Sequence, residues 1–175
     1  MTGAALEAVP AAAAAVLTLA DTAPGAVRAL LAGLGLELKY APAAAPVPGS
    51  YWGAPEAGLL GSTVWVRADT PVHSVLHEAC HALCMDDQRR AALTGDAGGD
   101  FDEENAVCCL QIVLADELEG VGAERLMQDM DAWGYTFRLG SARAWYTGEA
   151  VDARRWLEAR GLVGPNVRPR RRGAP

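Results

Sequence analysis

The chain has 175 residues, of which 51% are hydrophobic and 21% charged, and its formal net charge is −7. This length is enough for one domain with its own core, and this composition excludes a wholly disordered chain. The negative charge argues against a general nucleic-acid-binding protein, because binding to phosphates needs a basic face. We expect one globular domain over residues 1–164. The Pro- and Arg-rich residues 165–175 are expected to form a disordered basic tail.

The cysteines and the hydrophobic runs indicate the compartment. The spacing of the four cysteines (Cys80, Cys84, Cys108 and Cys109) is not that of a disulfide framework, so reduced thiols are expected. The apolar run Ala11–Ala20 follows no Lys or Arg and therefore lacks the charged start of a signal peptide. No stretch approaches the roughly 18 uninterrupted apolar residues of a membrane-spanning helix. We expect a cytoplasmic protein that does not enter a membrane.

The N-terminal part predicts helices followed by strands. It begins with one or two Ala- and Leu-rich helices, the second opened by Pro24. Residues 36–40 alternate between apolar and polar side chains, which is typical of a half-buried strand. Residues 41–58 are rich in Pro, Ala and Gly and predict a surface loop. Residues 59–67 predict a strand that is kinked or turned at Gly61.

The rest of the chain predicts helices. Asp69-Thr70-Pro71 supplies an N-cap and a first turn for a helix over 71–85, and residues 86–102 lack periodicity and predict a loop. The further predicted helices span residues 103–118, 123–133, 141–146 and 149–160, with Gly161 just after the last one. These patterns predict an α+β fold in which a small antiparallel or mixed sheet packs on a mostly helical remainder.

The motif that carries chemistry is His77-Glu78-Ala79-Cys80-His81. Residues four apart lie above one another on a helix, so His77 and His81 present two imidazoles to the same point. That arrangement suits a tetrahedral metal ion, and imidazole nitrogen suits zinc. Glu78 cannot be a third ligand from the same helix face, but it can reach a water molecule beside the metal. The alternative is a surface helix whose histidines have no common role.

This motif and its context resemble the zincin metallopeptidases, in which a strand and a short turn precede the HExxH helix. No histidine follows His81, so the third ligand must be a carboxylate, as in the gluzincin type. Several gluzincin families carry Glu-x-x-Ala on the next helix, and Glu103-Glu104-Asn105-Ala106 matches this pattern. The order of elements over about residues 25–118 most resembles the small bacterial domain of the ImmA/IrrE type. The resemblance implies a minimal zincin-like domain.

The resemblance also implies a zinc ion held by His77, His81 and a glutamate. Glu103 lies on the same helix stripe as Val107 and the following leucines, so we favour Glu103 as the third ligand. Glu104, about 100° away on the helix, is the second choice. The family has Asn or Asp where this chain has Val107, so the group that orients a ligand is absent or supplied elsewhere.

Other residues near the motif have less specific interpretations. His73 lies four residues before His77 and extends the same helix stripe. Three roles are open for it: a group that orients a ligand, a hydrogen-bond donor to the transition state, or a histidine of the core. Cys80 and Cys84 are expected to be buried like small hydrophobic residues. A metal site that uses Cys84 beside the histidines is the alternative. Four residues are assigned no role in chemistry, as loop carboxylates or core aromatics: Asp100, Asp102, Tyr135 and Tyr146.

The resemblance implies a zinc-dependent, regulatory intracellular peptidase. Water activated by zinc would hydrolyse a peptide bond, with Glu78 as the general base. An edge strand near residues 64–67 would hold the peptide or protein substrate by strand addition. The alternative is a non-catalytic, zinc-stabilised protein-binding module, which would not need Glu78. A third, weaker interpretation is a hydrolase of a non-peptide amide.

Overall fold

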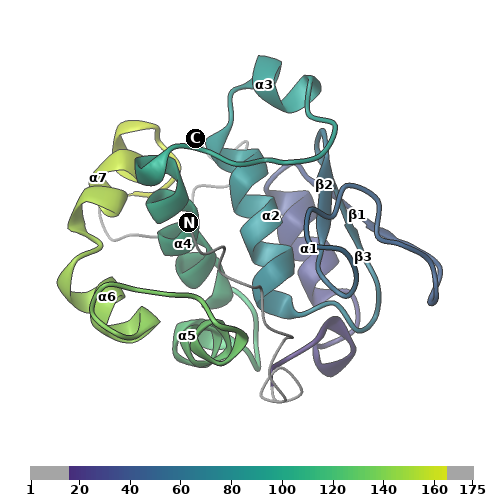
Figure 1. Cartoon of the computed structure of the whole chain (residues 1–175), viewed down its shortest axis with the longest axis horizontal. Coiled ribbons are helices and arrows are strands. Elements are labelled where there is room, and N and C mark those ends of the chain that lie inside the picture. Colours follow the sequence, from purple (N-terminus) through teal and green to yellow (C-terminus); the bar gives the residue numbers. More distant parts are fainter. Residues whose placement is uncertain (1–15, 165–175) are drawn as a thin grey trace, which may run out of the picture.

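A computed structural model describes residues 16–164, which form an α+β fold as predicted (Figure 1). After a 3-10 turn at Leu19–Asp21, the helices are α1 (Ala26–Gly33), α2 (Val72–Cys84), α3 (Asp87–Ala91), α4 (Phe101–Ala115), α5 (Gly122–Trp133), α6 (Ala142–Gly148) and α7 (Val151–Ala159). The strands are β1 (Glu37–Tyr40), β2 (Gly58–Leu60) and β3 (Thr63–Val66). The predicted N-terminal helix within residues 1–15 and the predicted tail over 165–175 lie outside the described residues.

The sheet is small and mixed, with the order β1-β3-β2. Strand β1 runs parallel to β3, and β2 runs antiparallel to it. The predicted strand over residues 59–67 is therefore two strands joined at Gly61, whose positive φ of 59° favours glycine. Because β3 is the central strand, both of its edges are already hydrogen-bonded. The prediction that a substrate peptide adds to an edge strand near residues 64–67 is thus wrong.

Helices α2 and α4 pack against each other at the centre of the molecule (Figure 1). The sheet and α1 lie on the far side of α2, whereas α6 and α7 lie beyond α4. One hydrophobic cluster runs from α1 and the sheet through both central helices to α7. Since α2, α5 and α7 all contact α4, this helix is buried on nearly every side. It therefore has no single apolar stripe.

Two helix starts differ from the prediction because an aspartate side chain caps each of them. Asp86 accepts a hydrogen bond from the backbone N–H of Arg89 at 2.7 Å and starts α3, a helix within the segment 86–102 that the sequence predicts to be a loop. Asp100 accepts from the backbone N–H of Glu103 at 2.9 Å, so α4 begins two residues earlier than predicted. Both aspartates are typical N-cap residues.

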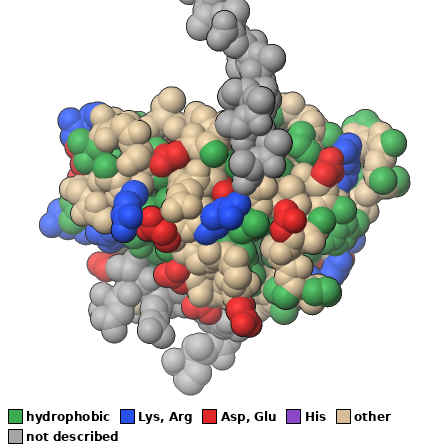
Figure 2. All heavy atoms as spheres, turned by 90° about the horizontal axis from the view of Figure 1, so that it is seen from below, with side chains coloured by type: hydrophobic (Ala, Val, Ile, Leu, Met, Phe, Trp, Pro, Cys, Tyr) green, Lys and Arg blue, Asp and Glu red, His purple; other side chains and the backbone are tan. Residues whose placement is uncertain are grey.

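The outer surface of the described residues carries charges of both signs. Figure 2 shows the molecule from below, with acidic and basic side chains interspersed and neither kind gathered into one patch on this face.

Within residues 16–164, the helices all fall short of the length and apolar character that crossing a membrane requires.

Candidate metal centre

Three side chains from the two central helices meet at one point. His77 and His81 lie one turn apart on α2, and their Nε2 atoms are 3.2 Å from each other. Glu104, in the first turn of α4, places Oε1 3.6 Å from Nε2 of His81. One potential ligand atom from each residue lies within 4.8 Å of the other two. Among the described residues, no other set of three His, Cys, Asp or Glu side chains meets in this way.

These distances fit a zinc ion. Bonds of about 2.0–2.1 Å in a tetrahedral site place neighbouring ligand atoms roughly 3.3 Å apart, which is close to the two observed distances. Burial, followed by the neighbouring His81, lowers the pKa of His77 to about 4. Burial, followed by the nearby Arg89, lowers the pKa of His81 to about 4. Both imidazoles are therefore neutral at pH 7, which is the form that binds a metal.

The structure brings Glu104, the second choice, to the histidines and directs Glu103, the preferred ligand, elsewhere. Oε2 of the buried Glu103 accepts a hydrogen bond from Nη1 of Arg89 at 2.7 Å. The preference for Glu103 assumed that the apolar stripe of the helix faces α2. That assumption fails because α4 is buried on nearly all sides, so apolar residues do not mark the face toward α2.

Gln111 orients the first histidine. Its fully buried side chain places Oε1 3.0 Å from Nδ1 of His77, and its Nε2 donates to Sδ of Met130 at 3.0 Å. Because Gln111 accepts at Oε1, it favours the tautomer in which His77 keeps a free lone pair on Nε2. This is the orienting group that Val107 does not supply. A signal existed in the sequence, since Gln111 follows Glu104 by seven residues, or two helix turns.

The three side chains line a cleft of about 360 Å³. Its lining comprises Gly49, Tyr51, Trp52, Glu56, His77, Glu78, His81, Gly95, Asp96, Ala97, Gly98, Glu104 and Tyr135. Glu78 is half-buried in this lining. Burial, and then the nearby Glu56, Glu104 and Asp96, raises the pKa of Glu78 to about 8. A carboxyl group that titrates near neutral pH can both accept and donate a proton.

Two loops form the walls of the cleft. Arg89 holds the first of them, because its Nη2 donates to the backbone oxygens of Ala97 at 2.8 Å and Gly98 at 2.7 Å while its Nη1 binds Glu103. The second wall is the loop before β2, which carries Tyr51 and Trp52. These two side chains are 64% and 66% exposed, and their rings meet edge to face at 4.9 Å.

His73 lies outside the set of three. It is 1% exposed and packs against the rings of Trp133 and Tyr135 at 5.0 and 5.5 Å. Nδ1 of His73 is 3.5 Å from the hydroxyl oxygen of Tyr135. This placement is that of a core histidine. Tyr135 itself lines the cleft, whereas the sequence predicts no role for it. It follows the end of α5, where no periodic pattern indicates its direction.

The cysteines and the remaining candidates do not join the three residues. Cys80 and Cys84 are buried and free, and burial raises the pKa of both thiols, that of Cys84 to about 12. Neither thiol belongs to the group of potential ligand atoms that meet at one point. Asp100 caps α4, and the ring of Tyr146 packs against Arg154.

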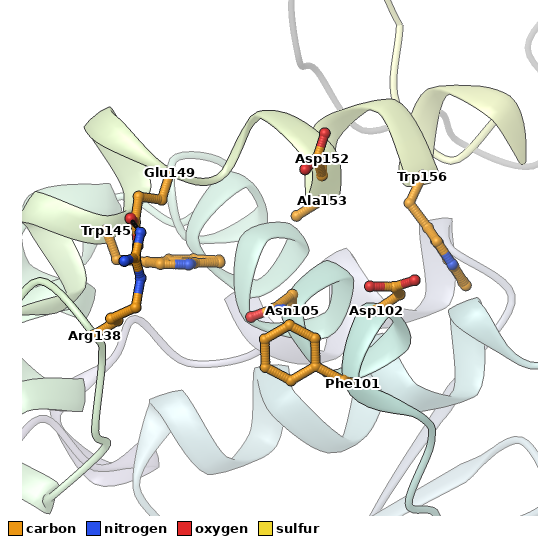
Figure 3. Close-up of a pocket in the computed structure, with 9 residues that line it drawn as sticks. All are labelled: Phe101, Asp102, Asn105, Arg138, Trp145, Glu149, Asp152, Ala153 and Trp156. Atoms are coloured by element: carbon orange, nitrogen blue, oxygen red, sulfur yellow. Dashed lines mark hydrogen bonds and ion pairs between the residues drawn. The ribbon is translucent and has the colours of Figure 1, made fainter.

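A larger cavity of about 510 Å³ lies between the start of α4 and helices α6 and α7 (Figure 3). Arg138 and Glu149 pair at one end, and Asp102 and Trp156 stand at the other. Among the described residues that line this cavity there is no histidine or cysteine, so it lacks the imidazole and thiolate ligands that most zinc sites contain.

No protein-family model, curated protein or solved structure matches the chain.

Proposed function

We propose that the protein is a zinc-dependent peptidase that uses His77, His81 and Glu104 as ligands and Glu78 as the general base. One observation carries this proposal: three potential ligand atoms meet in an open cleft that Glu78 also lines. The zincin-like interpretation of the sequence supports it, with Glu104 in place of Glu103.

The geometry favours catalysis over a structural role for the metal. Structural zinc sites have four protein ligands, whereas catalytic sites have three and leave one position for water or substrate. Three potential protein ligands meet among the described residues, and they line a cleft of about 360 Å³. A non-catalytic binding module would need neither the open position nor a carboxyl group at residue 78.

The chain's own residues divide the work of hydrolysis. Zinc, when bound, polarises a substrate carbonyl and lowers the pKa of water. Glu78 accepts the proton of the attacking water and passes it to the leaving amine. Gln111 keeps Nε2 of His77 directed at the ligand position. Burial raises the pKa of Tyr135 well above its usual value, so this residue of the cleft lining keeps a protonated hydroxyl.

The test compares the zinc-loaded wild type with Glu78→Gln, which keeps the size of the side chain but cannot accept the proton. We expect about one zinc per chain in both proteins by elemental analysis. Cleavage of a mixed peptide library, followed by mass spectrometry, should fall by at least about 100-fold in the variant. Asp102→Asn in the larger cavity is the matched control and should cleave like the wild type.

Three outcomes would contradict parts of the proposal. Equal cleavage by both proteins would show that Glu78 is not the base. A zinc-loaded wild type that cleaves no peptide but binds a partner would favour the non-catalytic module. Less than about 0.2 equivalents of zinc after zinc addition would overturn the metal site itself.

A further inference from the structure

The cleft carries more negative charge than the proposed chemistry uses. Four carboxyl side chains line it, and Glu78 and Glu104 already have roles as base and ligand. The two charges of a bound zinc ion offset those two carboxylates. Glu56 and Asp96 then remain, and none of the described residues that line the cleft is Lys or Arg. The cleft thus attracts cations even when the metal is bound.

Glu56 is the better placed of the two remaining carboxylates. Its side chain is partly buried, and Oε1 accepts a hydrogen bond from the indole N–H of Trp133 at 3.0 Å. No Lys or Arg within residues 16–164 forms an ion pair with it. Burial raises the pKa of Glu56, which means that its charged form lacks full solvation. A carboxylate in this situation is stabilised by a cation that arrives with a ligand.

An aromatic pair lines the same cleft. Tyr51 and Trp52 are about two-thirds exposed, although large apolar side chains are usually buried. The face of an indole or phenol ring attracts ammonium and guanidinium groups. The combination of an unpaired carboxylate and exposed aromatic rings is a common way to bind an organic cation.

We infer that the cleft receives a cationic group of the substrate, an ammonium or a guanidinium, with Glu56 as its counter-ion and Tyr51 and Trp52 beside it. The group belongs either to a Lys or Arg side chain near the scissile bond or to the free α-amine of a peptide. This inference rests on the proposed function, because that function makes the ligand a peptide.

The experiment measures peptide binding, so that it does not depend on turnover. The zinc-loaded full chain carrying Glu78→Gln is titrated with six-residue peptides by calorimetry. One pair of peptides, blocked at both ends, differs only in lysine or norleucine at one position. A second pair contains no Lys or Arg and differs only in a free or acetylated N-terminus. Whichever pair shows the preference identifies the source of the cation.

We expect the cationic member of one pair to bind at least about 10-fold more tightly, as a charge-assisted hydrogen bond would give. Adding Glu56→Gln should bring that ratio close to one, because glutamine still accepts from Trp133 but carries no charge. Glu158→Gln, which removes an exposed carboxylate on α7 outside the cleft, should keep the ratio. Calorimetry with the double variants therefore separates the charge of Glu56 from its structural contact.

The inference would be overturned if the two members of each peptide pair bind with equal affinity. It would also be overturned if the ratio of their affinities is the same with and without Glu56→Gln. The proposed function fails in a different way, in the parallel assay on the wild type. If the wild type binds zinc and cleaves peptides without any preference for a cationic group, only this inference is contradicted. If the protein cleaves no peptide but binds the cationic peptide through Glu56, the cation site is supported and the proposed peptidase activity is contradicted.

Discussion

Nδ1 of His77 lies 3.0 Å from Oε1 of Gln111, and this contact links the two central helices beside the candidate metal centre. Gln111 is fully buried and is held in turn by Sδ of Met130. The orientation of His77, a proposed zinc ligand on α2, therefore depends on a residue of α4 that is not among the residues lining the cleft.

Replacing Gln111 by leucine should weaken zinc binding by about 10- to 100-fold, the usual cost of losing a group that orients a histidine ligand. Leucine is close in size to glutamine and should preserve the packing between α2 and α4. Competition with a chromophoric chelator measures the affinity. Gln111→Glu retains an acceptor for the Nδ1–H of His77 and is the matched control. An affinity unchanged in Gln111→Leu would show that the contact does not orient the ligand.

Residues local to one helix were predictable from the sequence, and residues that depend on helix packing were not. His77 and His81 follow from a spacing of four, and Glu78 follows from its place in the motif. The choice between Glu103 and Glu104 depends on the rotation of α4 against α2. Burial of α4 on nearly all sides removes the usual signal for that rotation. The partner of Glu103 is Arg89, which lies in a segment without periodicity.

Exchanging each glutamate for glutamine should separate their two roles. Glu104→Gln should lower zinc affinity by about 10-fold or more, because it removes a charged ligand. Glu103→Gln should leave zinc affinity within about threefold but lower the free energy of unfolding, since Arg89 loses its ionised partner. Chelator competition and urea denaturation give the two quantities. The opposite ranking in zinc affinity would return the ligand role to Glu103.

In the sheet, too, the local features were predictable from the sequence and the long-range contacts were not. Alternation predicted strand character at residues 36–40 and 59–67, and the structure confirms it. The pairing of β1 with β3 joins segments 26 residues apart in sequence, and alternation carries no information about such partners. The central position of β3 was therefore not predictable, and a wrong role as an edge strand followed.

Arg89→Gln should loosen the wall of the cleft at Ala97 and Gly98. The arginine forms three hydrogen bonds, to two backbone oxygens and to Glu103, and glutamine is too short to replace them. Hydrogen exchange of the backbone amides in residues 95–99 should speed up by about 10-fold, which corresponds to roughly 1.4 kcal/mol of local stability. Arg143→Gln, which breaks an exposed ion pair with Glu124, is the control and should leave these amides unchanged. Equal exchange in wild type and Arg89→Gln would refute the role of Arg89.

The buried imidazole of His73 should make folding stability depend on pH. Burial, and then the neighbouring His77, lowers its pKa to about 3, and the other polar group facing it is the hydroxyl of Tyr135. An unfolded chain binds the same proton with a pKa near 6.5. Between these two values the unfolded state holds more protons than the folded state, so stability falls as the pH falls from about 6.5 toward 3.

The size of this effect follows from the two pKa values. Between pH 7 and pH 5, His73 should contribute a loss of about 2 kcal/mol in the free energy of unfolding. His73→Phe removes the titrating group and keeps a ring against Trp133, so the loss over this range should be smaller by that amount. His77 and His81 also titrate, but they remain in both proteins and cancel in the comparison. Urea denaturation at the two pH values, in EDTA to remove metal binding, measures the difference. His73→Gln serves as a second variant if phenylalanine disturbs packing, and a loss equal to that of the wild type in both variants would show that His73 is not the group responsible.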